Sequence, residues 1–319
     1  MGQHHARVCS EDPRVKLVGL VDTNEVIARE VSKKCKTKYH LDYRKLFGQV
    51  DAVNIAVPTF LHYQITKDFL EQGVHVLLEK PMTKNLLEAE NLIRIARSAG
   101  VLLAIGHIER FNPAVKDLRG LVTKPVFIDA HRMGPPTTRN LDVGVVLELM
   151  IHDLDIVLSV VKAPVKRVHA LGLSVYSNYE DIAQAQLLFE NGCLVGLSAS
   201  RVSAEKVRGL EITQEDAFIS LDYMAQNITL RRQVSGNFVF NPKACYRREV
   251  VEEQPLISKD EPLKLEIVNF LDSITGKGKP VVTGADGKNA LDLALRIIDN
   301  MELVCSRENR LARELAMMP

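Results

Sequence analysis

Short apolar runs alternate with helical patterns in the first third of the chain. Apolar, β-rich runs occur at residues 15–22, 52–57, 74–78 and 101–105, and helical periodicity follows at 24–34, 61–72 and 85–99. Strands separated by helical segments of this length indicate βαβ units and a parallel sheet. Nearly continuous apolar strands are typical of a sheet that is covered on both faces. These residues therefore predict an α/β domain.

The pattern changes near residue 106. A strand run at 125–132 precedes a long apolar helix at 143–161, and further strand runs follow at 165–176, 182–189, 194–201, 209–212, 217–222 and 228–231. Asn191-Gly192 between two of them is a strong hairpin signal. Consecutive strands with short turns indicate a mostly antiparallel sheet, and helices are predicted at 263–274 and 287–305. We therefore predict an α/β domain at 1–106 and an α+β domain with a large open sheet at 107–319.

Composition narrows the class of protein. A length of 319 residues suits two domains at about 150 residues each. The 41 basic and 40 acidic residues nearly cancel, which argues against binding to nucleic acid or to a membrane surface. No apolar run reaches the ~18 residues of a membrane span, and no signal-peptide core is present, so a cytoplasmic protein is expected. The widely spaced cysteines predict free thiols rather than disulfides or a metal site.

Polar residues at the ends of the first strand runs are candidate ligand contacts. Asp22 lies 20 positions after Gly2 and ends the first run. In a dinucleotide fold an acid there accepts hydrogen bonds from the adenosine ribose and repels a 2′-phosphate, which favours NAD over NADP. The alternative is a turn or helix cap beside Asn24. Pro58, Thr59 and His62 follow the second run, although Thr59 also suits a helix N-cap.

Glu79 and Lys80 directly follow the third strand run, VHVLL. Carboxyl ends of parallel strands meet at one edge of a sheet, where ligands bind. Lys80 can orient a substrate hydroxyl or take its proton. The alternative is an ordinary solvated lysine in a loop.

The apolar helix at 143–161 carries Glu148, His152 and Asp155 at positions i, i+4 and i+7, which places them on one stripe. Buried charged groups need partners, and Glu148 could orient His152 toward a cleft. A satisfied core His–Glu pair is the structural alternative. A metal site is less favoured, because no third ligand and no H-E-x-x-H motif is evident.

Basic residues near the domain junction are candidate substrate contacts. His107 and Arg110 follow the fourth strand run, where they could reach the crevice or serve as a linker. Arg132 and Arg139 flank a Gly-Pro-Pro loop. Arginines there could clamp a phosphate or diphosphate group, and a solvated loop is the alternative.

Several motifs together resemble the Gfo/Idh/MocA oxidoreductases. AVPTFLHY, LLEKPMT, GHIERFNPAV, VVLELMIHDLDIVL and the C-terminal stretch EPLKLEIVNFLDSITGKGKPVVTGADGKNALDLALRII occur in that family's order. The resemblance implies a Rossmann domain, an open-sheet domain that often forms homodimers or homotetramers, and NAD(P)-dependent hydride transfer at a sugar or cyclitol hydroxyl. Lys80 matches the family's E-K-P lysine. Glu148 and His152 match its D-x-x-x-H pair, with Glu in place of the usual Asp.

Three stretches, including FENGCLVGLSASRVSAEKVRGLEI, look most similar to UDP-N-acetylglucosamine 3-dehydrogenases within the family, which implies a UDP-sugar substrate. The alternatives are myo-inositol, a simple sugar, or a non-catalytic sugar- or nucleotide-binding protein. Lys80 and His152 both remain candidates for the proton acceptor, with Glu148 as the third catalytic residue. The expected NAD contacts are Gly2, Asp22, Asn24, Pro58, Thr59, His62, Glu79, Lys80 and His107. The expected substrate contacts are Arg110, Arg132, Arg139 and Asp155.

The start of the chain predicts a gap in the first domain. Gly2 would be the last glycine of a G-x-G-x-x-G fingerprint, whose first two glycines and preceding strand are not in the sequence. That strand is central in the usual order 3-2-1-4-5-6, so both of its neighbours would lose a partner. We expect a start codon assigned too far downstream. The 319-residue chain should then fold poorly or bind NAD weakly.

Overall fold

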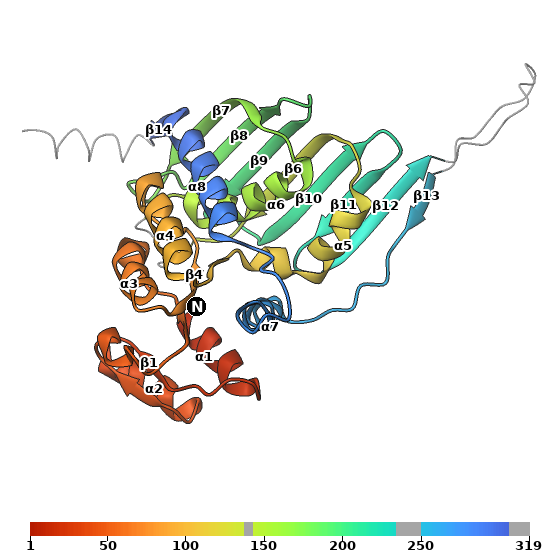
Figure 1. The fold of residues 1–319 in the computed structure, drawn as a ribbon. Helices are drawn as coiled ribbons and strands as arrows, with labels where there is room; N and C mark the ends of the chain where they lie inside the picture. Colours follow the sequence, from red (N-terminus) through yellow and green to blue (C-terminus); the bar gives the residue numbers. More distant parts are fainter. Residues whose placement is uncertain (137–142, 234–249, 306–319) are drawn as a thin grey trace, which may run out of the picture. The chain divides into compact units, whose positions relative to one another are not determined.

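A computed structural model describes residues 1–136, 143–233 and 250–305 (Figure 1). The chain divides into two compact units. Unit 1 comprises Met1–Phe111 and Asp260–Asp292, and unit 2 comprises the described residues of Asn112–Lys259 and Leu293–Pro319. The first break falls close to the predicted boundary at residues 106 and 107. The second break differs from that prediction, because residues 260–292 return to unit 1.

Unit 1 is an α/β unit. Its elements are α1 (Gly2–Glu11), β1 (Gly19–Val21), α2 (Glu25–Lys34), β2 (Lys38–His40), η1 (Tyr43–Leu46), β3 (Ala52–Ile55), α3 (Thr59–Glu71), β4 (His75–Glu79), α4 (Leu86–Ala99), β5 (Leu103–Gly106), η2 (Ile108–Phe111), α7 (Pro262–Ile274) and the first part of α8 (Gly284–Asp299). Helix α7 joins this unit because its apolar residues Leu263, Ile267 and Phe270 pack in one cluster with Val8 and Leu77. Burial of that apolar surface is the driving force for the association.

Local capping chemistry explains where the helices begin and end. Asn24 caps α2 by accepting from two backbone N–H groups, and Asn85 caps α4 by accepting from the backbone N–H of Glu88. Gly100 ends α4 in the left-handed conformation that glycine adopts without strain. The suggested N-cap role of Thr59 is wrong. Pro58 precedes α3, and no side chain caps that helix.

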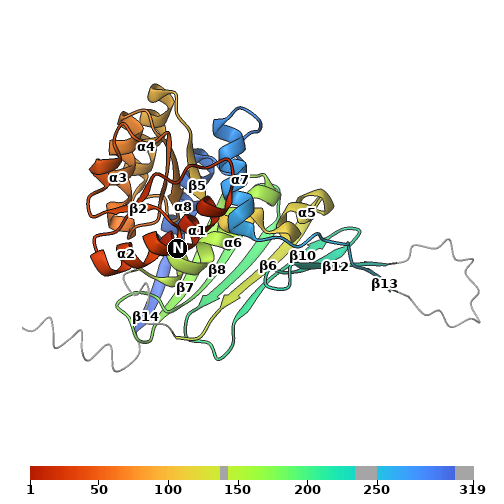
Figure 2. The ribbon, with the colours of Figure 1, turned by 90° about the horizontal axis from the view of Figure 1, so that it is seen from below.

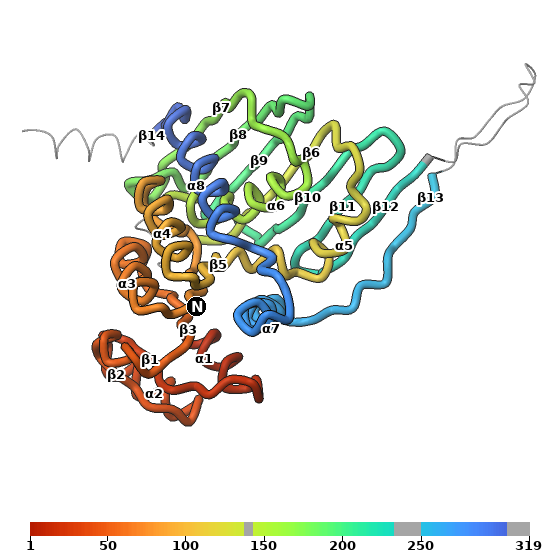
Figure 3. Tube along the Cα trace, in the orientation of Figure 1, coloured from red at the N-terminus to blue at the C-terminus, as the bar shows by residue number. Residues whose placement is uncertain are grey.

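The strands of unit 1 form two separate parallel sheets rather than one. β1 pairs with β2, and the second sheet has the order β3-β4-β5. Figure 3 follows the chain from α1 through β1, α2 and β2 to β3. Within the described residues, β1 and β3 are not paired with each other, and α1 contacts both α2 and β3. The division falls where the usual Rossmann order places its first strand.

Unit 2 is built on one large sheet. Its elements are α5 (Pro113–Leu121), β6 (Pro125–Met133), η3 (Val146–Met150), α6 (Ile151–Val161), β7 (Val165–Ser174), β8 (Ile182–Phe189), β9 (Leu194–Ser200), β10 (Val207–Gln214), β11 (Phe218–Asp222), β12 (Asn227–Gln233), β13 (Val250–Glu253), the end of α8 and β14 (Met301–Cys305). The strand order is β13-β12-β11-β10-β6-β9-β8-β7-β14. Among the described strands of this sheet, only the β6–β9 and β7–β14 pairs are parallel, so the predicted mostly antiparallel sheet is confirmed.

Alternation along the strands separates the two faces of this sheet. Ile128 and Ala130 of β6 are buried, whereas Phe127 of the same strand is exposed on the other face. Helices α5 and α6 lie on the buried face (Figure 2). The hairpin predicted at Asn191-Gly192 joins β8 to β9, and Gly192 has the positive φ that such a turn requires.

The structure corrects two predicted helices. The helix predicted at 143–161 begins with a π-helical turn, η3, before α6. The helix predicted at 287–305 ends at Asp299, and the next segment is the strand β14 beside β7. The sulfur of Met301 occupies the space where a Cβ would lie on Gly172. The absent side chain of Gly172 thus lets β14 approach β7, a long-range fit that periodicity does not contain.

Candidate active site

The residues that the sequence predicted as NAD contacts lie after the strands of unit 1. Pro58 and Thr59 follow β3, Glu79 ends β4, Lys80 comes next, and His107 follows β5. These three parallel strands share one sheet, so their carboxyl ends form a common edge. Ligands of open α/β sheets bind at this edge.

Asp22 follows β1 and has a local role. Its Oδ1 accepts the backbone N–H of Asn24 at 2.8 Å, so the turn proposed as the alternative reading is present. A carboxylate accepts more than one hydrogen bond, and Asp22 is partly exposed. It therefore keeps the capacity to accept hydrogen bonds from ribose hydroxyls. Asn24 itself is engaged as the cap of α2.

His62 holds two loops together. Its imidazole is buried between two carbonyl oxygens, with Nδ1 at 2.9 Å from Pro81 O and Nε2 at 2.9 Å from Val57 O. Burial lowers the pKa of His62, against the opposing effect of these two carbonyls. Backbone carbonyl oxygens thus face both ring nitrogens of His62, and its predicted contact with NAD stays a prediction. His62 ties the end of β3 to the loop after Lys80.

Glu79 also has a partner inside the protein. Its Oε1 lies 2.8 Å from Nε2 of His5, and both side chains are buried. A Cβ on Gly106 would come within 3.2 Å of Glu79 Oε2, so glycine leaves room for the carboxylate. The sequence analysis missed His5. The sequence did contain a signal for it, namely an imidazole in the first turn of a helix that packs on the sheet.

The N-terminus of α1 lies near the edge described above. Helix α1 begins at Gly2 without a side-chain cap, and His5 in its first turn reaches Glu79 at the end of β4. Uncapped N–H groups and the helix dipole favour an anion at such a position. The NAD contacts expected at Gly2 and Asp22 stay a prediction.

The remaining predicted residues of unit 1 are at least partly buried. Lys80 is partly buried directly after β4. His107 is buried after β5, and Arg110 is buried in η2. Each of the three interacts with other groups of the chain.

In unit 2, Glu148 lies in the π-helical turn and pairs with Arg201. Arg201 Nη1 lies 3.1 Å from Glu148 Oε2, and Arg201 Nε lies 2.8 Å from Asp181 Oδ1. Asp181 also accepts the backbone N–H groups of three successive residues beginning at Val175. These bonds, with burial opposing them, hold the pKa of Asp181 at about 2. The sequence analysis missed Arg201 and Asp181, which are far from Glu148 along the chain.

Glu180 fixes the start of this helical segment. Its Oε1 accepts the backbone N–H of Val146 at 3.1 Å, and its backbone carbonyl accepts that of Val145. Gly144 makes this possible, because any Cβ there would collide with the Glu180 carboxyl group. Burial raises the pKa of Glu180, against the opposing effect of the Val146 N–H. π-Helical turns occur frequently at functional sites, and this one leads directly to His152.

The structure corrects the predicted role of Arg132. Its guanidinium is 1% exposed and makes two bonds to the Asp153 carboxylate, at 2.7 and 2.8 Å. It also lies 4.9 Å from the ring centroid of Tyr223. This arginine therefore neutralises a buried acid rather than clamping a substrate phosphate.

His152 is partly buried, and Asp155, one turn later, is buried. Arg139, the other predicted phosphate contact, lies outside the described residues. The assignment of Asp155 to substrate stays a prediction.

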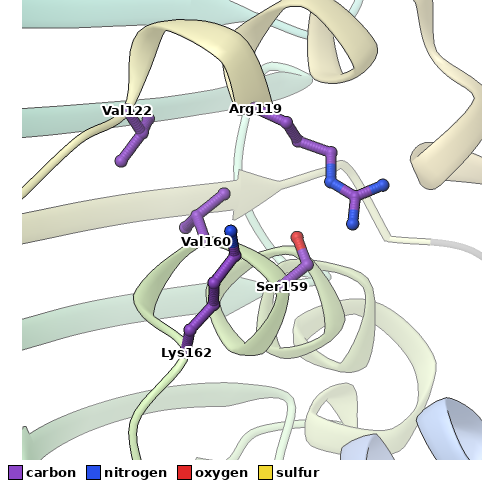
Figure 4. Close-up of a pocket in the computed structure, with 5 residues that line it drawn as sticks. All are labelled: Arg119, Val122, Ser159, Val160 and Lys162. Atoms are coloured by element: carbon purple, nitrogen blue, oxygen red, sulfur yellow. The ribbon is translucent and has the colours of Figure 1, made fainter.

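A separate small pocket of unit 2 contains none of the predicted residues. Figure 4 shows Arg119 from α5 with Ser159 and Val160 from α6 and Lys162 just beyond α6; Val122 completes the lining. Both cations lie at the C-terminal ends of helices, where the helix dipole favours positive charge. The helix dipoles therefore account for the positions of Arg119 and Lys162.

Other features of the described residues bear on the class of site. No cluster of three or more His, Cys, Asp or Glu side chains among them is placed to hold a metal ion. Cys9, Cys35 and Cys193 are free thiols, and burial raises the pKa of Cys9 and of Cys193 to about 11. Thiols with such pKa values are poor nucleophiles. In the same part of the chain, no helix is both long and apolar enough to cross a bilayer.

Comparison with known proteins shows which family this architecture belongs to. Residues 1–107 match the oxidoreductase family with an NAD-binding Rossmann fold, and residues 122–220 match the GFO/IDH/MocA C-terminal domain. The chain belongs to the Gfo/Idh/MocA oxidoreductase family. This result confirms the predicted fold class, and the chain is accordingly an enzyme, a dehydrogenase of that family.

Two relatives within the Gfo/Idh/MocA family cover nearly the full chain. A UDP-N-acetylglucosamine 3-dehydrogenase from Acidithiobacillus ferrooxidans is 32% identical over 93% of each chain. A solved structure of an enzyme of that name and organism has a TM-score of 0.85 and 31% identity, covering 94% of this chain and 93% of that one. A myo-inositol 2-dehydrogenase from Thermotoga maritima is 25% identical over 90% of this chain and 89% of its own.

A more distant solved structure shares the fold. A levoglucosan dehydrogenase in complex with NADH has a TM-score of 0.80 at 16% identity, over 94% of each chain. At this identity the likeness concerns architecture alone. The family match of residues 1–107 is to a domain described as an NAD-binding Rossmann fold.

Proposed function

We propose that this Gfo/Idh/MocA enzyme oxidises the C3 hydroxyl of UDP-N-acetylglucosamine with NAD as the hydride acceptor. The observation that carries the proposal is the similarity to the Acidithiobacillus ferrooxidans enzyme over nearly the full length of both chains. The E-K-P lysine and the Glu148–His152 pair supply the residue types that this chemistry needs.

Bound NAD supplies the hydride acceptor. The chain's own residues have the tasks of binding and orientation. In the proposal, the first-turn amides of α1 hold the diphosphate and Asp22 accepts hydrogen bonds from the adenosine ribose. Glu79 fixes the end of β4, and Lys80 directly follows that strand.

Lys80 and His152 are the two candidates for the group that takes the hydroxyl proton. A neutral lysine amine and a neutral imidazole can each accept a proton, whereas a lysine ammonium instead orients the hydroxyl oxygen. Arg201 engages Glu148, which makes Glu148 a positioning residue for the π-helical turn that precedes His152.

An inositol is the alternative substrate, because the Thermotoga maritima relative that acts on myo-inositol also covers most of the chain. The test is NADH formation by the purified protein with UDP-N-acetylglucosamine and, separately, with myo-inositol. We expect NADH to form with the sugar nucleotide, together with a product that mass spectrometry finds to lack two hydrogens. Turnover of myo-inositol but not of the sugar nucleotide would select the alternative.

The Asp22 carboxylate is proposed to set the preference for NAD over NADP. Replacing Asp22 with asparagine removes the negative charge and keeps an acceptor for the Asn24 N–H. A hydrogen bond to a charged group contributes about 1.5–3 kcal/mol, so the ratio of NADH to NADPH affinity should fall by about tenfold or more. Fluorescence titration with each nucleotide measures this ratio.

Asp42→Asn is the matched control. Asp42 also accepts a backbone N–H two residues further along, from Arg44, at the start of another helical turn. That variant should leave the ratio unchanged. If the ratio of NADH to NADPH affinity fell equally in both variants, the cause would be local backbone structure and not ribose recognition.

We also propose that the open face of the nine-stranded sheet joins copies of this chain into a homodimer or homotetramer. Phe127, Leu171, Leu194 and Val207 are exposed on this face by 40%, 45%, 44% and 47%. Phe127 and Leu194 are cross-strand partners, so their side chains adjoin. Exposed apolar area of this kind is typical of protein–protein contacts. Light scattering of the purified chain measures the assembly.

A further inference from the structure

The π-helical turn η3 is not explained by its own residues. Four of its five residues, from Val146 to Met150, are Leu, Glu or Met, which favour the ordinary α-helix. The backbone N–H of Ile151 nevertheless donates to Val146 O, five residues back instead of four. Such a turn contains one residue more than an α-helical turn, so it rotates every side chain that follows it. Contacts from elsewhere in unit 2 therefore hold this turn, and His152 is the second residue after it.

Arg201, the residue directly after β9, bridges two points of this segment. Its Nη2 donates to Val143 O at 2.9 Å, and its Nη1 lies 3.1 Å from Glu148 Oε2. The first contact lies before η3 and the second lies within it. A guanidinium is a rigid planar fork, so binding both points fixes the distance between them. Arg201 is 3% exposed, which limits competition from water for these bonds.

Asp181 holds the guanidinium of Arg201 in place. Arg201 Nε donates to Asp181 Oδ1 at 2.8 Å, and the Arg201 backbone N–H donates to the Asp181 carbonyl oxygen at 3.0 Å. Asp181 Oδ2 accepts three successive backbone N–H groups, beginning at Val175, at 2.8, 2.7 and 2.9 Å. Ser177 Oγ also donates to Asp181 Oδ1, at 2.7 Å. The carboxylate is thus fixed by the backbone of its own loop, and it fixes the arginine in turn.

Neutralisation of a buried acid does not by itself account for Arg201. Such a role needs one carboxylate, and the two bonds between Arg132 and Asp153 are an example. Arg201 instead directs Nε to Asp181 and uses both terminal nitrogens on the segment that leads into α6. Asp181 also receives the backbone and hydroxyl hydrogen bonds given above, which stabilise its charge without the arginine.

We propose that Arg201 is a positioning residue: anchored by Asp181, it clamps the π-helical turn between Val143 and Glu148 and so sets the orientation of His152. Without the clamp, the segment can relax toward the α-helix that its residues favour, which turns His152 about the helix axis. A misplacement of about 1 Å can lower a rate about 100-fold. The catalytic role of His152 rests on the proposed function, whereas its orientation is measurable without any substrate.

Two variants separate the clamp from the charge. Arg201→Lys keeps the cation, but a single ammonium lacks the planar fork that binds both points, and Arg201→Met removes cation and fork together. Gln214→Met is the matched control. Gln214 is 5% exposed, and its side chain binds the backbone of Leu121 and Thr123 at the end of another helix of unit 2, α5.

NMR of histidine-labelled protein measures the orientation of His152, with its ring signals assigned from their loss in His152→Gln. We expect these signals to shift in Arg201→Lys and Arg201→Met and to keep their wild-type positions in Gln214→Met. Wild-type His152 signals in Arg201→Lys would overturn the proposal, because the positive charge would then be sufficient.

Hydrogen exchange followed by mass spectrometry measures the turn itself. Loss of bonds to a charged group should speed exchange in the peptide across η3 about tenfold or more in both Arg201 variants, while α5 keeps its wild-type exchange. Faster exchange of equal size in η3 and α5 would indicate a general loss of stability and would contradict a local clamp.

Turnover provides a further readout. The kcat of Arg201→Lys should fall about 100-fold with little change in NADH affinity, and Gln214→Met should keep the wild-type kcat. A wild-type kcat in Arg201→Lys would overturn the positioning role. Absence of turnover in the wild-type chain would instead contradict the proposed function, and the His152 signals would still decide whether the clamp exists.

Discussion

Replacement of Lys80 with methionine is expected to lower kcat by about 10²–10⁴-fold, the usual contribution of a positioned acid or base. Methionine keeps the length and the apolar stem of the side chain and removes the nitrogen. The partly buried position after β4 therefore stays filled while the hydroxyl loses its proton acceptor or its orienting charge. Initial rates of NADH formation measure the effect, and NADH affinity should change by only a few-fold.

Lys84→Met is the control for this prediction. Lys84 lies four positions further along, is exposed, and contacts the ring of Phe60. It should retain the wild-type rate. A Lys80→Met variant with full turnover on every accepted substrate would show that the assignment is wrong. His152 would then be the remaining candidate for the proton acceptor.

Replacement of Arg132 with methionine is expected to destabilise the protein by about 3–5 kcal/mol, because it leaves an uncompensated charge in the interior. Arg132 and Asp153 are 1% and 3% exposed at their side chains and meet through two hydrogen bonds. The variant also removes the cation from the face of the Tyr223 ring. Urea denaturation of the full chain measures the change in the free energy of unfolding.

Two further variants show whether burial is the cause. Arg231→Met removes an ion pair with Glu252 in which both side chains are about half exposed, and exposed pairs contribute only about 0–1 kcal/mol. The double variant Arg132→Met with Asp153→Leu should recover much of the loss, because no buried charge remains. A loss of less than about 1 kcal/mol for Arg132→Met alone would contradict the assigned role.

Local patterns predicted most of the secondary structure. The strand at residues 182–189 has the predicted ends, and the Asn191-Gly192 turn joins it to β9. Asn85 and Gly100 bound α4, where the periodic segment begins and ends. These features depend on residues a few positions apart, and the alternation and capping chemistry of neighbours is present in the sequence itself.

Where the predictions failed, distant residues were the cause. The strand β14 has helical neighbours before it, and it forms because β7 offers an edge with space above Gly172. The π-helical turn η3 is held at its start by Glu180, from the segment between β7 and β8. Periodicity within the segment at 143–161 contains no information about that contact.

The sequence by itself determined the family, the order of α/β and open-sheet parts, and the candidates Asp22, Lys80 and His152. It did so because motif spacing and hydrophobic periodicity are local properties. Only the tertiary structure decided which charged groups meet. Arg132 neutralises Asp153, Arg201 holds Glu148, and Glu79 pairs with His5. These pairings matter because the groups are buried, and a charged group removed from water needs a partner. The partners are far apart in the sequence, so only the tertiary structure brings them together.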